Sequence, residues 1–320
     1  MMQFYKKRDF GTFISDSFTF FKLYGKNYFK NYILINGLLL ILLVVVIMFG
    51  FGEIFSQIFS SNLAGQSYYF ESYFQDNFGM LIATGILTFI LYLALMIINY
   101  LYPVFYMKRI SQGETKIGAD QILGDFKNNL GKIFILCLGV VFIIIPLMFV
   151  VLGISAFLMF IIIGFFLFLF FIPVIFNMLN FLMFDYFNTK RGFFESLSYA
   201  IRAQFSYPNG REKSPFWKYW GATVIVILIL YVISTVFSFI PMLYFQGAIL
   251  TTPTDGNFEQ NPFEGTAGII FFIISGISTI VSLFLANLLY VNTGLMYYDS
   301  RTDLHQKVGL AEIETIGINE

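Results

Sequence analysis

The chain has 320 residues, of which 58% are hydrophobic and only 12% are charged, and its mean hydropathy is +0.76. Because soluble domains carry roughly 25% charged residues, this composition argues against a soluble fold. A formal net charge of zero argues against a nucleic-acid partner. We therefore expect an all-α integral membrane protein that forms a single membrane domain over residues 1–320.

Six uncharged apolar segments are long enough to be transmembrane helices, since about 20 apolar residues span a bilayer core of about 30 Å. They are Ile33 to Phe51, Gly79 to Met107, Ile133 to Leu152, Ser155 to Phe184, Tyr219 to Phe245 and Gly268 to Tyr298. The third and fourth form one continuous apolar stretch that contains Pro146, Gly153 and Ser155. We predict a tight hairpin at these residues.

The basic residues are distributed unevenly along the chain. All 19 Lys and Arg residues lie in four segments, which are 6–30, 108–132, 190–218 and the tail at Arg301 and Lys307. The intervening loops Gly52 to Phe78 and Gln246 to Ala267 contain acidic residues and no basic residue. Since basic loops are retained in the cytoplasm, this pattern predicts that both termini lie in the cytoplasm.

The segments before the odd-numbered spans share a helical spacing of apolar residues, which predicts three interfacial amphipathic helices. The chain then reads as three repeats of an interfacial helix and a helical hairpin, at about 9–113, 114–191 and 192–301, followed by an acidic cytoplasmic tail at 302–320. In the first segment Lys22, Lys26 and Lys30 are stacked four residues apart. They are candidate contacts for lipid headgroups, or a solvated basic face that only follows the positive-inside rule.

Short motifs accompany this pattern at the segments Gly11 to Asn31 and Gly192 to Phe205, at Tyr297-Tyr298-Asp299-Ser300-Arg301, and at Phe184-Asp185 before Lys190-Arg191. With these motifs the chain resembles a broad group of uncharacterised bacterial six-helix membrane proteins, related to the membrane domain attached to some glycerophosphodiester phosphodiesterases. The resemblance implies a six-helix multi-pass fold in the bacterial cytoplasmic (inner) membrane. It implies no activity, since the 320 residues hold no segment resembling the soluble phosphodiesterase domain.

Groups that carry catalysis are scarce in the spans. The six apolar segments contain no Asp, Glu, Lys, Arg or His, and the chain has one cysteine, Cys137, and one histidine, His305. We therefore expect no catalytic residue, no metal site and no cofactor. Asp185 and Asp299 lie where spans meet the cytoplasm, and we expect them to pair with Lys190 and Arg301.

Five asparagines are the polar groups that recur inside the spans. They are Asn99, Asn177, Asn180, Asn287 and Asn292. All lie on helices that return to the cytoplasm, about 5 to 12 residues before their ends, so they share a depth in the inner leaflet. They either bond one another and backbone freed near Pro103 and Pro173, or line a polar cavity open to the cytoplasm.

The leading functional hypothesis is a noncatalytic accessory or scaffold subunit of an envelope assembly, because the spans lack titratable groups. Its partners would be membrane lipids and other membrane-protein subunits. One alternative is a carrier or channel for a lipid-like or neutral substrate. A second alternative is a lipid-modifying enzyme that works at the cytoplasmic interface.

Overall fold

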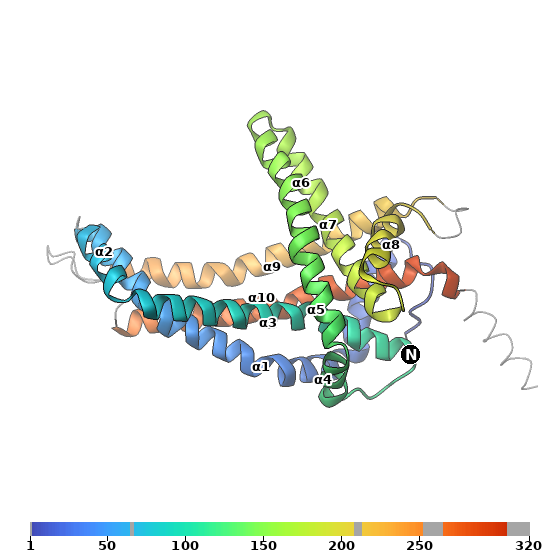
Figure 1. Cartoon of the computed structure of the whole chain (residues 1–320), viewed down its shortest axis with the longest axis horizontal. Helices are drawn as coiled ribbons and strands as arrows, with labels where there is room; N and C mark the ends of the chain where they lie inside the picture. The colour runs from blue at the N-terminus through green and yellow to red at the C-terminus, as the bar shows by residue number, and fades with distance from the viewer. Residues whose placement is uncertain (1, 65–66, 208–212, 252–264, 306–320) are drawn as a thin grey trace, which may run out of the picture. The chain divides into compact units, whose positions relative to one another are not determined.

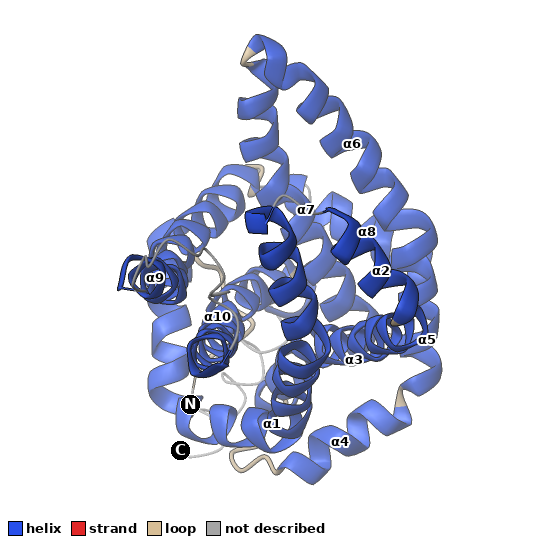
Figure 2. Ribbon diagram, turned by 90° about the vertical axis from the view of Figure 1, so that its left-hand side faces the viewer, coloured by secondary structure: helices blue, strands red, loops and turns tan. Residues whose placement is uncertain are grey.

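The computed structural model describes residues 2–64, 67–207, 213–251 and 265–305, and these residues form helices, turns and loops with no strand (Figure 2). The α-helices are α1 (Phe10–Ala64), α2 (Ser67–Asp76), α3 (Phe78–Ser111), α4 (Ala119–Asn128), α5 (Leu130–Gly139), α6 (Ile145–Phe157), α7 (Ile163–Asn188), α8 (Phe193–Phe205), α9 (Phe216–Thr251) and α10 (Gly265–Ser300). A π-helical turn, Val140–Ile144, joins α5 to α6, and a 3-10 turn, Leu158–Ile161, follows α6.

Six helical segments of the described chain are long and apolar enough to cross a membrane. They are Phe10–Gly50, Phe78–Ser111, Leu130–Ile161, Ile163–Asn188, Phe216–Gly247 and Gly268–Ser300. Large apolar side chains on these segments are widely exposed, for example Phe142, Phe149 and Phe160. Such a surface suits hydrocarbon rather than water. The chain is therefore a helical multi-pass membrane protein in contact with lipid, as the sequence predicts.

The chain forms two compact units that alternate along the sequence. Unit 1 consists of Met1–Tyr32, Tyr100–Leu228 and Asn287–Glu320, and unit 2 consists of Ile33–Asn99 and Ile229–Ala286. Unit 2 has an aliphatic core built on Leu40, Leu43 and Leu95. In the same unit Gly276 packs directly against Val44, and a larger residue there would overlap the valine side chain. Unit 1 contains α4 to α8 and the residues of the candidate site.

The hairpin between the third and fourth spans, in unit 1, turns later than the sequence predicts (Figure 1). Gly153 and Ser155 lie inside α6, so the predicted break at these residues is wrong. The turn is at Ile162, whose φ of 65° is left-handed. It is possible there because Gly164 lies against the backbone of Ser155 and Met159, where a Cβ atom would not fit.

Pro146 likewise fails to end a helix. It occupies the first turn of α6, directly after the π-helical turn Val140–Ile144. A proline inside a continuous helix removes one backbone hydrogen bond, and the π-helical turn before Pro146 is where the regular hydrogen-bond pattern is interrupted. The stretch Leu130–Ile161 therefore continues as one candidate span.

The three predicted interfacial segments differ in form. Gly11 to Asn31 is not a separate short helix, since it belongs to the 55-residue helix α1 and no proline interrupts it. The other two are separate helices, α4 and α8. Each begins after an extended glycine whose N–H is capped from the third helical residue: Gly118 by Gln121 at 2.8 Å and Gly192 by Glu195 at 3.1 Å. Their placement at the membrane surface stays a prediction.

Candidate functional site

A fully buried carboxylate in the last turn of α10, Asp299, binds four donors in unit 1. Its Oδ1 accepts the Arg8 backbone N–H at 2.6 Å. Its Oδ2 accepts the Tyr207 hydroxyl at 3.0 Å, the Lys218 ammonium at 2.8 Å and the Tyr219 hydroxyl at 2.6 Å. These donors come from the segment before α1, the segment after α8 and the first turn of α9. Asp299 thus fixes three separate parts of the chain to α10.

The guanidinium of Arg8 fixes the N-terminal segment from the other side. It is 2% exposed, and it donates to the carbonyl oxygens of Phe4 and Gln3, both at 2.7 Å, and to Asp16 Oδ2 at 2.9 Å. Burial lowers the pKa of Arg8, and the hydrogen bond and charge of Asp16 oppose this shift. The guanidinium of Arg8 therefore ties the carbonyl groups of the segment before α1 to Asp16 in α1.

A second buried carboxylate, Asp185, lies in the last turn of α7. Its Oδ1 accepts Arg191 Nη1 at 2.9 Å, lies 3.5 Å from the Tyr297 hydroxyl and is 3.9 Å from Arg301 Nη1. The Arg191 guanidinium also lies 4.7 Å from the ring centroid of Tyr199 in α8. Asp185 therefore joins the end of α7 to the start of α8 and to the end of α10.

The predicted partners of the two aspartates need correction. Asp185 pairs with Arg191 rather than with Lys190, because the chain reverses after α7 and returns Arg191 toward the helix end. Asp299 pairs with Lys218 rather than with Arg301. The guanidinium of Arg301 instead makes two 2.9 Å bonds to the carboxylate of Asp303.

A group of buried tyrosines packs in the same unit. Tyr28 makes edge-on ring contacts with Tyr102 and Tyr106, each with ring centroids 4.8 Å apart. The Tyr102 hydroxyl donates to the Tyr28 carbonyl at 2.5 Å, and the Tyr106 hydroxyl donates to Asn27 Oδ1 at 2.8 Å. Asn27 and Asn31 in turn both donate to the carbonyl of Ile117 before α4. Hydroxyl and amide groups therefore connect α1, α3 and the start of α4.

The five predicted asparagines are all buried, with exposed fractions of 0 to 1%. Asn287 Oδ1 accepts the Tyr28 hydroxyl at 2.6 Å, and Asn177 Oδ1 accepts the Thr223 hydroxyl at 2.7 Å. Asn292 donates to the Phe13 carbonyl at 3.1 Å and to Ser17 Oγ at 3.0 Å. Asn180 donates within its own helix, to the Phe176 carbonyl at 2.9 Å.

These four asparagines lie in unit 1, whereas Asn99 lies in unit 2. In the hydrogen bonds just described, each of the four meets another side chain or a carbonyl rather than another member of the set. Such bonds are the helix-packing contacts expected of amides in a membrane. A shared asparagine cavity stays a prediction.

The three lysines of the predicted headgroup contact are exposed along α1. Lys22, Lys26 and Lys30 all have exposed side chains, and the neighbouring apolar residues Phe18 and Leu23 are 50% and 55% exposed. An ammonium row beside exposed apolar side chains is compatible with the lipid-water boundary. The contact with lipid headgroups itself is untested.

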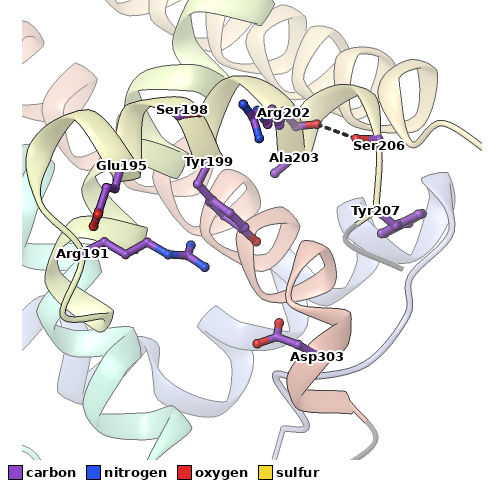
Figure 3. A pocket seen from close by; sticks show the side chains of 9 residues that line it. All are labelled: Arg191, Glu195, Ser198, Tyr199, Arg202, Ala203, Ser206, Tyr207 and Asp303. Atoms are coloured by element: carbon purple, nitrogen blue, oxygen red, sulfur yellow. Dashed lines mark hydrogen bonds between the residues drawn. The ribbon is translucent and has the colours of Figure 1, made fainter. Parts of the chain in front are cut away.

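A pocket of about 520 Å³ lies along α8 and was not predicted from the sequence (Figure 3). It is lined by Arg191, Glu195, Ser198, Tyr199, Arg202, Ala203, Ser206, Tyr207 and Asp303. The sequence contains a signal for it, because Glu195, Ser198, Tyr199 and Arg202 recur at helical spacing on one side of α8. None of the five asparagines lines this pocket.

The described residues contain no group of three or more His, Cys, Asp or Glu side chains that could hold a metal ion. Comparison of the chain with protein-family models, curated proteins and solved structures gives no match. The resemblance to six-helix bacterial membrane proteins therefore remains a prediction.

Proposed function

We propose that the chain is a noncatalytic protein of the bacterial inner membrane that acts as an accessory or scaffold subunit of an envelope assembly. One observation carries this proposal. In the described residues the fully buried charged side chains are Arg8, Asp185 and Asp299, and each makes hydrogen bonds or ion pairs. A carboxylate that holds helix ends together in this way has a structural part in the fold, and neither aspartate lines the α8 pocket.

The proposal includes an orientation and a repeat. Both termini lie in the cytoplasm, and the three repeats each supply an interfacial helix and two spans. The first half of α1, together with α4 and α8, lies at the headgroup level, where Lys22, Lys26 and Lys30 attract anionic lipids by about 1 kcal/mol each. The support is the distribution of basic residues and the exposed lysine row on α1.

The test is extraction of the tagged full chain from its native membrane in a mild detergent, followed by sizing and quantification of every protein in the peak. A scaffold subunit should elute with one or more other membrane proteins at a constant ratio in several detergents. An unrelated six-span protein with the same tag controls for nonspecific association. A peak that holds this chain alone, or only copies of it, contradicts the scaffold proposal.

A carrier is the second candidate, and one side chain favours it. Asn36 in unit 2 is 0% exposed, and both its amide atoms lack a hydrogen-bond partner among the described residues. An unsatisfied amide in hydrocarbon costs free energy, and such polar groups commonly mark substrate paths. Carrier activity would be seen as loss of uptake or export of a neutral substrate when Asn36 is replaced by leucine in an otherwise stable protein.

A further inference from the structure

The helix α8 has three chemically different sides. Its buried side consists of Phe193, Ser196, Ala200, Ala203 and Gln204. A second side carries Phe194, Ile201 and Phe205, which are 70%, 41% and 49% exposed. The third side forms the pocket wall with Glu195, Ser198, Tyr199 and Arg202, and Ser206 lines the pocket directly after the helix. At about 100° per residue, the apolar exposed side lies next to the pocket side.

In a membrane protein an exposed apolar side of a short helix is stable when it rests in hydrocarbon. The adjacent polar side of α8 then lies at the level of the lipid headgroups. The pocket, at about 520 Å³, is within the range of small-molecule sites, which is roughly 300 to 1,000 Å³. A headgroup at this depth could enter it while its acyl chains remain beside Phe194, Ile201 and Phe205.

The guanidinium groups of Arg191 and Arg202 line the pocket and have N–H donors that the described residues do not use. Arg202 is exposed, and its guanidinium has no hydrogen bond or ion pair with the described residues. Arg191 uses one nitrogen on Asp185 and lies over the ring of Tyr199, which leaves most of its five N–H donors open. Figure 3 shows the Arg191 and Tyr199 side chains reaching into the same space. Guanidinium groups that line one pocket can both donate to the oxygens of a phosphate.

The pocket also contains acceptors. Asp303 is occupied by its two bonds to Arg301. Glu195 uses Oε2 to cap the Gly192 N–H, and its side chain is exposed, so Oε1 is available to a ligand. A simple anion would bind Arg191 and Arg202 but would be repelled by Glu195. A ligand that carries both a phosphate and a primary ammonium can place the phosphate against the guanidinium groups and the ammonium against the Glu195 carboxylate.

We propose that the α8 pocket binds the headgroup of an amine-bearing phospholipid of the phosphoethanolamine class. Arg191 and Arg202 hold the phosphodiester, and Glu195 accepts a hydrogen bond from the ammonium. This binding rests on the placement of α8 at the headgroup level in the proposed function, but it does not require the scaffold role. A choline headgroup cannot donate to Glu195, and an anionic glycerol headgroup brings no positive charge, so both bind more weakly.

The experiment uses the purified full chain in detergent micelles, titrated with tail-labelled phosphatidylethanolamine, phosphatidylcholine or phosphatidylglycerol. We expect the ethanolamine lipid to bind most tightly. Replacing Arg202 with glutamine should weaken this binding about tenfold, since one charge-assisted contact is lost. Replacing Glu195 with glutamine should remove the preference for ethanolamine over choline. The matched control is Lys213→Gln, which changes an exposed cation that does not line the pocket and should leave binding unchanged.

Three results would overturn the proposal. The first is equal binding by the Arg202→Gln and Lys213→Gln proteins. The second is an unchanged ethanolamine preference in Glu195→Gln. The third comes from competition with soluble glycerophosphoethanolamine: displacement of the lipid at equal concentration would assign the pocket to a soluble phosphorylated amine. Failure of the soluble compound to compete, with loss of lipid binding in Arg202→Gln, supports a membrane lipid.

Discussion

Unit 1 and unit 2 are both built from apolar helices, but their interiors differ. In unit 1 the described interior includes Arg8, Asp185, Asp299 and a set of hydrogen-bonded tyrosines. Unit 2 has an aliphatic cluster centred on Leu40, Leu43 and Leu95, and its buried Asn36 has no hydrogen-bond partner among the described residues. Hydrocarbon solvates leucine as well as a protein core does, so aliphatic packing in unit 2 gives little preference for one partner helix. The directional bonds of unit 1 specify which helix ends meet.

The largest expected effect is on the stability of unit 1 when Asp299 is replaced by alanine. The change leaves the Lys218 ammonium, the Tyr207 and Tyr219 hydroxyls and the Arg8 N–H without their acceptor. Breaking a buried ion pair from one side costs about 3–5 kcal/mol. We expect a large drop in the unfolding temperature measured in detergent.

The matched control for that change is Asp303→Asn, which removes a half-exposed carboxylate from a surface pair with Arg301. Its cost should be below about 1 kcal/mol. Similar unfolding temperatures for the Asp299 and Asp303 variants would show that Asp299 does not hold the helix ends together.

A smaller effect is expected at the hairpin turn of unit 1. Gly164→Ala places a methyl group against the backbone of Ser155 and Met159, and overpacking of this kind costs about 1–3 kcal/mol. Gly153 lies inside α6 with open space around it, so Gly153→Ala should be neutral or stabilising by up to about 1 kcal/mol. The comparison is made by thermal unfolding. The reverse ranking would place the turn at Gly153 instead.

Asparagine-to-leucine changes should have opposite signs in the two units. Asn292→Leu in unit 1 leaves the Ser17 hydroxyl and the Phe13 carbonyl without their amide donor and should cost about 1–3 kcal/mol. Asn36→Leu in unit 2 removes an amide with no partner and should be neutral or stabilising. Unfolding in a denaturing detergent gives both values. A strongly destabilised Asn36→Leu protein would mean that this amide is satisfied in the membrane.

The smallest effect is a pH dependence at the C-terminal end of unit 1. Hydrogen bonds from Arg301 lower the pKa of Asp303 below its ordinary value. The stabilisation that this interaction gives to the folded protein is therefore fully present above about pH 4. It is lost as the pH falls through the lowered pKa of Asp303. Because the side chain is 48% exposed, solvent screening keeps the contribution below about 1 kcal/mol. The Asp303→Asn protein should lose less stability between pH 5 and pH 3 than the parent, a range taken from these ordinary carboxyl values.

The sequence predicted the six spans because each is a long run without charge, and length and composition decide membrane insertion. It did not predict the partners of Asp299. Arg301 is close in sequence, but α10 ends at Ser300 and the guanidinium of Arg301 bonds Asp303 and the Tyr297 hydroxyl instead. The Arg8 N–H that Asp299 binds lies 291 residues away. Only the folded chain brings these groups together.

The predicted position of the hairpin turn was wrong for a local reason. Pro146, Gly153 and Ser155 are the expected turn formers. Because hydrocarbon offers no partner for free backbone N–H and C=O groups, an apolar segment in lipid favours a continuous helix over a turn. The chain turns at Ile162, a residue type that seldom adopts a positive φ, because Gly164 allows close backbone packing two residues later. One glycine within a uniform apolar sequence gives no periodic signal.

The predicted membrane topology has six passes, with both termini in the cytoplasm. The direct measurement is cysteine labelling of the full chain in a Cys137→Ser background, with a membrane-impermeant reagent added to intact cells. Cysteines at Gln75 and at Asn257, which lies outside the described residues, should react from outside. Cysteines at Gln112 and Lys190 should react only after the membrane is permeabilised. Labelling of Gln112→Cys or Lys190→Cys in intact cells would contradict the six-pass topology and the orientation that the basic residues predict.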